Sequence, residues 1–424
     1  MEVSITDITE VEKEIQIHAS ADELAPHFEE AYKRYQPKIE IKGFRKGKAP
    51  LDLIKKIYGE SIEYDALDTI ASNVYRQVVT EKDIQPIGQP VLTDIDYKRG
   101  EALTFKIKFE IKPNVELKEY KNIKVEKIIH PVTDKEIEEE ILRLRRANSI
   151  LSSVESATDD EHIVTVDIQE LDQTGNPLIG RKSTDVRMYL SDETVHPEIR
   201  TALKNTSVNA RSQVKIDLEH DSRKLTDYLE LTVKKIDKVT LPEYNDEFVS
   251  KITKQKIKTA DEFYHNVRKD LEEYWHERSE RKLTDAIVAE IVRRHDMTVP
   301  ETLVKGVLDS LIEELKNRYP NKKLLPDFDE KGFREEHQSY AIFQAKWYLL
   351  RERIIETEGI NVEDGDLERS AEQDAPKVGI EKDRLLTFYK SSDTVKNRIL
   401  SEKLMQFLKN HSVITEKVTK EFID

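Results

Sequence analysis

The chain has 424 residues, of which 37% are hydrophobic and 36% charged, and its formal net charge is −15. This length predicts two or three domains, and the low apolar share favours an elongated, helix-rich molecule with several small cores. Because the chain contains no cysteine, disulfides and thiolate metal sites are excluded. The acidic N-terminus lacks the pattern of a secretory signal, and no apolar run approaches membrane-spanning length. We therefore expect a soluble, cytoplasmic protein.

Residues 1–112 are expected to form a small α+β domain. Alternating apolar residues predict strands at residues 3–8, 11–19 and 103–111. Ser20 and Glu23 form a capping-box pattern before a helix, although Pro26 suggests that the first turn begins later. Two further helices are predicted at residues 51–58 and 62–79, so the segment before them would be an exposed loop between helices.

That loop is basic although the chain as a whole is acidic. Residues 36–59 contain seven lysines and arginines and two acidic residues, a local excess of five positive charges. Gly43 and Gly47 permit a positive φ or close approach to a partner, and Pro50 suits the start of the next helix. Phe44 would be an apolar plug among the cations. Two interpretations stay open from this pattern: a tip that docks on a phosphate-rich surface, or a solvated turn.

The loop also contains a long motif, which continues to Tyr58-Gly59. Its central residues are Gly43, Phe44, Arg45, Lys46, Gly47 and Lys48. This motif resembles the ribosome-binding signature of the trigger factor family. Leu241-Pro242-Glu243 and Val299-Pro300-Glu301 resemble junctions in the C-terminal part of that family. The resemblance covers essentially all 424 residues and is tightest near residues 38–60.

The resemblance implies a chaperone that docks through this loop at the ribosomal tunnel exit. Its expected partners are protein and RNA of the large ribosomal subunit, and nascent and unfolded polypeptides, with no membrane. Whether the protein forms a homodimer when it is not bound to the ribosome is left open. The chain has no phosphate-binding or dinucleotide-binding glycine motif, so we expect no nucleotide and no other cofactor. We find no nucleophile constellation and no histidine cluster with metal-ligand spacing, so neither a catalytic nor a metal site is predicted.

Residues 113–155 are interpreted as a linker that contains one charged helix, capped by Thr133 and Glu136. Residues 156–240 change to a β-rich pattern, with strands predicted at 162–168, 186–190, 212–218 and 225–236 and a turn at 173–177. In the trigger factor family this position holds a prolyl isomerase domain of the FK506-binding type. The resemblance places the pocket of that domain at Asp167, Ile168, Pro197 and Ile199.

The chain departs from the family pattern at this pocket. The aromatic residue expected after Asp167 is Ile168, and the Gly-Phe pair expected after Pro197 is Glu198-Ile199. An isomerase must lower a barrier of about 18–20 kcal/mol by holding the twisted amide in a dry, shaped pocket. Aliphatic and charged residues would fill that pocket differently or leave it wet. We therefore expect absent or weak isomerase activity, and packing within the strands is the expected role of Asp167 and Tyr189.

Residues 241–424 are expected to form an all-helical body with arms, which completes an α+β multidomain fold. A helix capped by Thr259 has a polar centre at residues 276–282, as a bridging helix or arm would have. Pro300 begins another helix, and further apolar stripes cover residues 340–354 and 395–408. These stripes could bind clients, but buried core is their expected role. The functional alternatives are an active prolyl isomerase and a ribosome-independent holdase or assembly chaperone.

Overall fold

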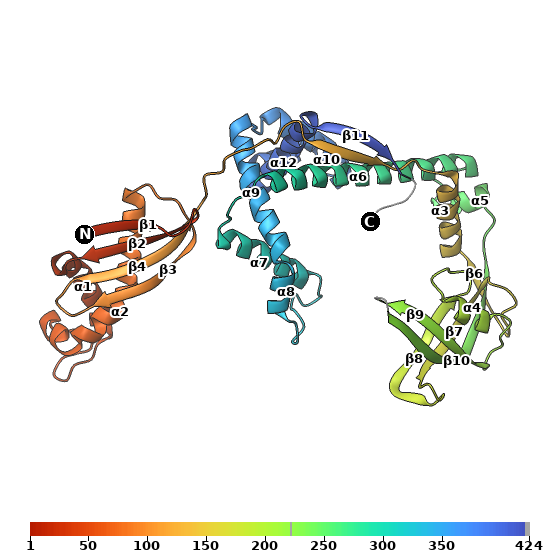
Figure 1. Cartoon of the computed structure of the whole chain (residues 1–424), viewed down its shortest axis with the longest axis horizontal. Helices are drawn as coiled ribbons and strands as arrows, with labels where there is room; N and C mark the ends of the chain where they lie inside the picture. The colour runs from red at the N-terminus through yellow and green to blue at the C-terminus, as the bar shows by residue number, and fades with distance from the viewer. Residues whose placement is uncertain (221–222, 420–424) are drawn as a thin grey trace. The chain divides into compact units, whose positions relative to one another are not determined.

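The computed structural model describes residues 1–220 and 223–419. The chain divides into two compact units, Met1–Lys127 with Lys282–Thr415 and Ile128–Arg281 with Glu416–Asp424. Both units are shown in Figure 1, and each is described by itself below. Within the described residues, none of the helices is both long enough and apolar enough to cross a membrane.

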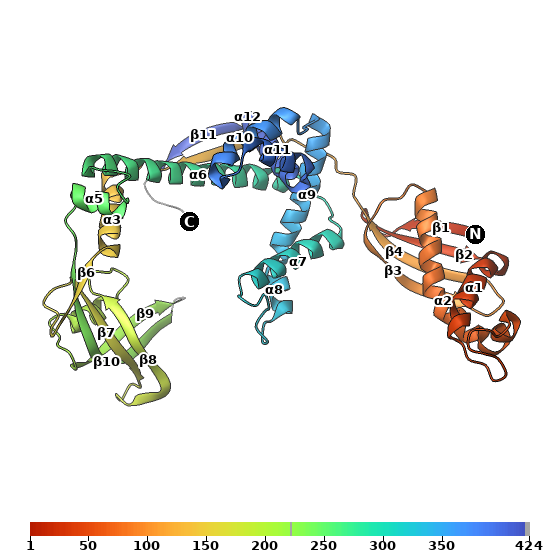
Figure 2. The ribbon, with the colours of Figure 1, turned by 180° about the vertical axis from the view of Figure 1, so that it is seen from behind.

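The first unit begins with a four-stranded antiparallel sheet in the order β1-β2-β4-β3. Helices α1 and α2 pack on one face of this sheet (Figure 2), and a single core of apolar side chains, including Ile17, Leu67 and Phe105, lies between the two layers. We call this α+β part of the first unit the first lobe. Its elements are β1 (Glu2–Asp7), β2 (Glu12–Ala19), α1 (Ala21–Tyr35), the 3-10 turn η1 (Gln36–Lys38), α2 (Leu51–Glu81), β3 (Pro86–Tyr97) and β4 (Leu103–Ile111).

Two local predictions for this lobe are wrong. Helix α1 begins directly after Ser20, because the Glu23 carboxylate accepts the Ser20 N–H and closes a capping box, and Pro26 lies inside the helix. The two helices predicted between residues 51 and 79 are one helix of 31 residues. Gly59 does not interrupt this helix, and the place of a Cβ at this position is taken by the guanidinium of Arg99.

The remainder of the first unit is mainly helical. Two helices of the predicted body begin where Pro300 and the apolar stripe at 340–354 indicate, and Leu308, Leu350 and Ile354 are buried as expected. The elements are α7 (Glu301–Asn317), α8 (Glu330–Glu336), α9 (Gln338–Glu358), α10 (Asp364–Val378), α11 (Lys382–Ser391) and α12 (Asp393–Asn410). Strand β11 (Val413–Val418), which pairs with β5 (Lys124–Ile129), departs from the expectation of an all-helical body.

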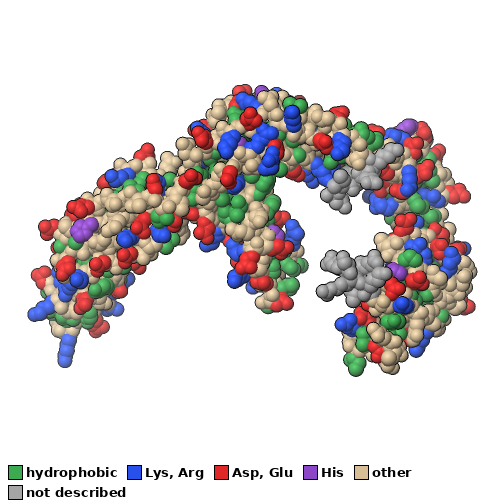
Figure 3. Space-filling model, in the orientation of Figure 1, with side chains coloured by type: hydrophobic (Ala, Val, Ile, Leu, Met, Phe, Trp, Pro, Cys, Tyr) green, Lys and Arg blue, Asp and Glu red, His purple; other side chains and the backbone are tan. Residues whose placement is uncertain are grey.

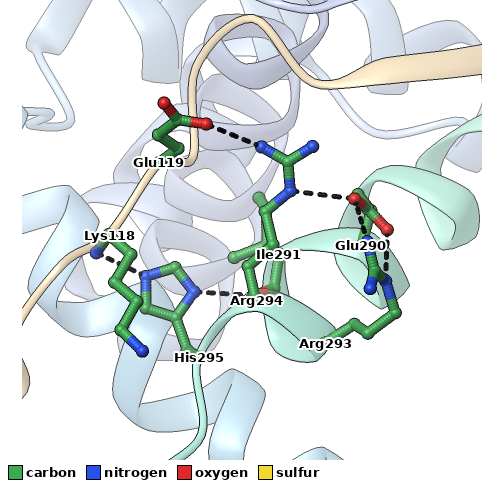
Figure 4. A network of polar contacts seen from close by, with 7 residues as sticks. All are labelled: Lys118, Glu119, Glu290, Ile291, Arg293, Arg294 and His295. Atoms are coloured by element: carbon green, nitrogen blue, oxygen red, sulfur yellow. Dashed lines mark hydrogen bonds and ion pairs between the residues drawn. The ribbon is translucent and has the colours of Figure 1, made fainter.

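Helix α6 (Ala260–Arg294) is continuous over 35 residues, as its capping pattern and polar centre predicted. Its C-terminal end is fixed by the polar network in Figure 4. The His295 side chain is 3% exposed, its Nδ1 lies 2.7 Å from the Ile291 carbonyl, and its Nε2 accepts the Lys118 N–H at 2.8 Å. Arg294 bonds both Glu119 and Glu290. The segment before β5 is thereby attached to the end of α6.

The second unit contains a five-stranded antiparallel sheet in the order β6-β10-β7-β8, with β9 paired to β10. The β-rich character predicted for residues 156–240 is confirmed, and Leu203 of the short helix α4 is buried against the sheet. The elements are α3 (Asp134–Ala147), β6 (Ile150–Val154), β7 (His162–Leu171), β8 (Pro177–Tyr189), α4 (Pro197–Leu203), β9 (Arg211–His220), β10 (Arg223–Thr240) and α5 (Asp246–Ile252).

Candidate functional site

The basic loop connects the end of α1 to the start of α2, at one end of the first lobe (Figure 1). Its backbone forms two successive tight turns. The Phe44 N–H donates to the Ile41 carbonyl at 3.0 Å, and the Lys48 N–H donates to the Arg45 carbonyl at 2.9 Å. These turns give the loop a defined backbone conformation, which is compatible with a docking tip and with a solvated turn.

The neck of the loop is closed by two hydrogen bonds across its width. The Gln36 side-chain amide donates to the Ala49 carbonyl at 2.8 Å, and the Gly47 N–H donates to the Ile39 carbonyl at 3.1 Å. Gly47 has φ +77°, and a Cβ at this position would lie 3.0 Å from Cα of Pro37. Both uses of a glycine, a positive φ and a close approach, are therefore present at Gly47.

The tip of the loop is open to solvent. The Phe44 side chain is 43% exposed, and several other large apolar side chains of the chain are exposed as well. Four cations lie near Phe44 in the sequence of the exposed loop, and none of them makes an ion pair within the described part of the chain: Lys42, Arg45, Lys46 and Lys48. Figure 3 shows lysine and arginine side chains projecting from this end of the lobe. The tip can therefore offer cations and one aromatic ring to a partner.

The residues predicted for an isomerase pocket lie on β7 and α4. The Asp167 carboxylate accepts the Asp185 N–H at 3.1 Å and pairs with Lys182 and Lys234 at 3.1 and 3.3 Å. The Asp185 amide and the two lysines lower the pKa of Asp167. These bonds attach the carboxylate to the neighbouring strands β8 and β10, so it already has partners that a bound peptide would have to displace.

The other three residues of the predicted pocket have packing and capping roles in the second unit. Ile199 is 7% exposed and belongs to the apolar core of the second unit, against which Ile168 also packs. Pro197 is the first residue of α4, where its missing N–H costs nothing, and His196 caps the helix. Within the described residues, no group of three or more histidine, aspartate or glutamate side chains could hold a metal ion.

The sequence did not reveal the residues that hold the loop in place. Gln36 and Ile39 close its neck, and a buried cluster around Glu63 lies beneath its two helices. These contacts join residues that are between 8 and 44 positions apart along the chain. No local pattern indicates such pairings, whereas the tip itself is a contiguous motif.

The arrangement of these parts defines a class of multidomain α+β protein with an exposed basic loop on its first lobe. Sequence comparison gives the family. A family model described as "Bacterial trigger factor protein (TF)" matches residues 1–144, and one described as "Bacterial trigger factor protein (TF) C-terminus" matches residues 259–410. The chain belongs to the trigger factor family.

Individual relatives agree over the full length. The trigger factor of Salinibacter ruber is 30% identical, over 100% of this chain and 96% of its own. The trigger factor of Chloroherpeton thalassium is also 30% identical, over 98% of this chain and 97% of its own. A solved structure, whose title concerns substrate recognition in folding and assembly by the trigger factor chaperone, is similar in fold. It has a TM-score of 0.50 and 21% identity, over 97% of this chain and 99% of the other.

Proposed function

We propose that this chain is an ATP-independent chaperone that docks on the large ribosomal subunit at the tunnel exit and shields nascent and unfolded polypeptides. Membership of the trigger factor family supports a ribosome-associated chaperone function. The docking surface is the finer part of the proposal. The observation that carries it is an ordered, exposed loop with unpaired cations around Phe44, on a chain of net charge −15.

The loop would bind through two kinds of contact. Arg45 and Lys46, with Lys42 and Lys48 beside them, would pair with phosphates of ribosomal RNA and with acidic groups of a ribosomal protein. The ring of Phe44 would fill an apolar recess between them. Because acidic side chains dominate the rest of the chain, RNA would be repelled elsewhere and contact would be confined to the loop.

Each predicted domain would have its own role in this function. Residues 1–112 would dock, residues 113–155 would link, and residues 241–424 would hold client chains, with residues 156–240 as a divergent isomerase-like domain. Tyr340 and Tyr348 of α9, which are 49% and 44% exposed, are candidates for client contact. A homodimer off the ribosome is an alternative state of the free protein, and sedimentation velocity of the chain alone would detect it.

The test is cosedimentation with vacant ribosomes over a salt series. We expect the variant Phe44→Ala/Arg45→Ala/Lys46→Ala to lose binding, and we expect wild-type affinity to fall steeply with salt because counterions are released from phosphates. The matched control is Tyr340→Ala/Lys135→Ala/Lys331→Ala, which also removes one exposed ring and two exposed cations. Equal binding by the loop variant and the wild type would refute the proposed docking surface.

A further inference from the structure

A buried carboxylate lies on α2, the helix that follows the basic loop. Glu63, on α2, is only 7% exposed. It accepts hydrogen bonds from the hydroxyls of Tyr32, on α1, and Tyr97, at the end of β3, the latter at 2.8 Å. The Nε of Arg99, in the turn between β3 and β4, lies 3.3 Å from the same carboxylate. A buried charge needs such partners, and here they come from three different elements.

Arg99 extends the cluster to the first turns of α2. Its guanidinium lies across Gly59 and donates to the Lys55 carbonyl at 2.8 Å. A Cβ at position 59 would overlap this guanidinium, so the Arg99 side chain can take this place only because residue 59 is glycine. The glycine that ends the sequence motif of the loop therefore has a physical role, which is to let an arginine from another element bond this part of α2.

The cluster is close to both ends of the loop. Tyr32 lies one helical turn before the end of α1, and Lys55 lies in the second turn of α2. The Lys55 ammonium is 5.5 Å from the centroid of the Tyr32 ring and 3.4 Å from the Glu29 carboxylate, so α1 and α2 are bonded directly here. A change in the spacing of the two helices would separate Gln36 from the Ala49 carbonyl and open the neck.

We propose that Glu63 is a positioning residue, whose carboxylate holds Tyr32, Tyr97 and Arg99 together so that α1 and α2 present the basic loop in its docking conformation. This inference rests on the proposed function of the loop. Glu63 does not contact the partner and acts through the loop. A buried ionised group is seldom more stabilising than an apolar residue of the same volume, so its contribution here is to geometry.

The first experiment measures ribosome affinity of Glu63→Gln and Tyr97→Phe by cosedimentation. We expect both variants to bind about five-fold more weakly than the wild type. Tyr75→Phe is the matched control, since it removes a buried hydroxyl of the same core that has no partner among the described residues. Val74→Ala is the control for lost stability, since Val74 is buried in that core and takes no part in the cluster. Both controls should keep wild-type affinity.

Gly59→Ala provides an independent variant. Alanine is the better helix former, by about 1 kcal/mol, so the helix itself should not suffer. The added methyl group would displace Arg99 and would lie 3.3 Å from the Tyr32 hydroxyl, and we expect the same loss of affinity, about five-fold, with the side chains of Glu63, Tyr32 and Tyr97 all retained. Should Glu63→Gln fail to fold, Gly59→Ala and Tyr97→Phe decide the question.

A double-mutant cycle separates positioning from general destabilisation. In the background Arg45→Ala/Lys46→Ala, Tyr97→Phe should cause little further loss, because the loop through which it acts is already disabled. Hydrogen exchange supplies a direct readout: the amides of Phe44 and Lys48 should exchange faster in the Tyr97→Phe variant, while those of β2 and β4 are unchanged. Additive losses, wild-type affinity, or unchanged loop exchange would overturn the inference. If the loop variants themselves bind normally, the proposed function fails instead.

Discussion

At the scale of single residues, Tyr75 is informative because its hydroxyl is buried and has no hydrogen-bond partner among the described residues. The side chain is 4% exposed, its ring packs against Phe109, and burial raises its pKa to about 12. An unsatisfied buried hydroxyl costs free energy that a phenyl ring avoids. We expect Tyr75→Phe to leave the free energy of unfolding unchanged or to raise it by about 1 kcal/mol.

Urea unfolding would check this prediction, with the unfolding transition of the first lobe followed by its tyrosine fluorescence. Tyr97→Phe is the comparison, because the Tyr97 hydroxyl donates to Glu63 and its loss should be destabilising. A loss of stability in Tyr75→Phe as large as that in Tyr97→Phe would mean that the Tyr75 hydroxyl has a partner, such as a buried water molecule.

Asp366 is a second residue whose surroundings give a quantitative expectation. This carboxylate is 8% exposed, and the Lys403 ammonium, the Glu363 N–H and the Arg369 guanidinium lower its pKa from 3.8 to about 2. A depressed pKa stabilises the folded state at pH values above 3.8, and this stabilisation disappears as the pH falls toward 2. It amounts to about 2 kcal/mol at neutral pH, where Asp366→Asn should lose it.

Hydrogen exchange of the α10 and α12 amides, measured for wild type and Asp366→Asn between pH 7 and pH 2, would test this expectation. The protection of the two proteins should differ at neutral pH and converge in acid. A constant difference over the whole range would show that the asparagine lowers stability by its shape and that the ion pair with Lys403 contributes little.

At the scale of elements, the helices were predictable where a cap and an apolar stripe coincide. The strands β3 and β11 were missed because they lack a regular alternation of buried and exposed side chains. Most side chains of β3 are not buried, and its register shifts twice against β4, so the period-two pattern is broken. Every residue of β11 is exposed, so its sequence carries no alternation. Helix α2 was divided at Gly59 because the need for glycine there comes from Arg99, 40 positions further along the chain.

The candidate site shows the same contrast. Its tip, around Phe44 and Arg45, was predictable because the motif is contiguous and its glycines have local consequences. The bonds between Gln36 and Ala49, and between Glu63 and Tyr97, were not predictable, because they depend on which helices and strands come together in three dimensions.

The middle sheet leads to a prediction about catalysis. The Asp167 carboxylate is held by Lys182 and Lys234, and Ile199 is packed in the core. A dry, aromatic-lined site for a proline ring would need the side chains of Asp167 and Ile199 to face the bound peptide. We expect the full chain to leave the cis–trans exchange rate of a proline-containing peptide at its uncatalysed value, measured by NMR exchange spectroscopy. Acceleration that is abolished by Asp167→Ala would show instead that this carboxylate serves an active site.

At the scale of the whole molecule, the basic loop and the exposed aromatic residues of α9 lie far apart along the chain. The local excess of five positive charges lies within residues 36–59, on a chain of net charge −15, and the exposed aromatic residues of α9 lie far from it in sequence. The core beneath the loop belongs to residues 3–111 alone. Docking and client binding should therefore be separable by substitution, since no packed residue is shared between the loop tip and α9.

The variant Phe44→Ala/Arg45→Ala/Lys46→Ala should accordingly suppress aggregation of a chemically denatured client as well as the wild type does when ribosomes are absent. Exposed loop residues contribute little packing, so its stability should change by less than about 0.5 kcal/mol. Light scattering after dilution of the client gives the measurement, and Tyr340→Ala/Tyr348→Ala, with the loop intact, is the reciprocal variant. We expect that variant to bind ribosomes normally and to suppress aggregation less well. Loss of suppression in the loop variant would mean that the tip contacts unfolded chains as well as the ribosome.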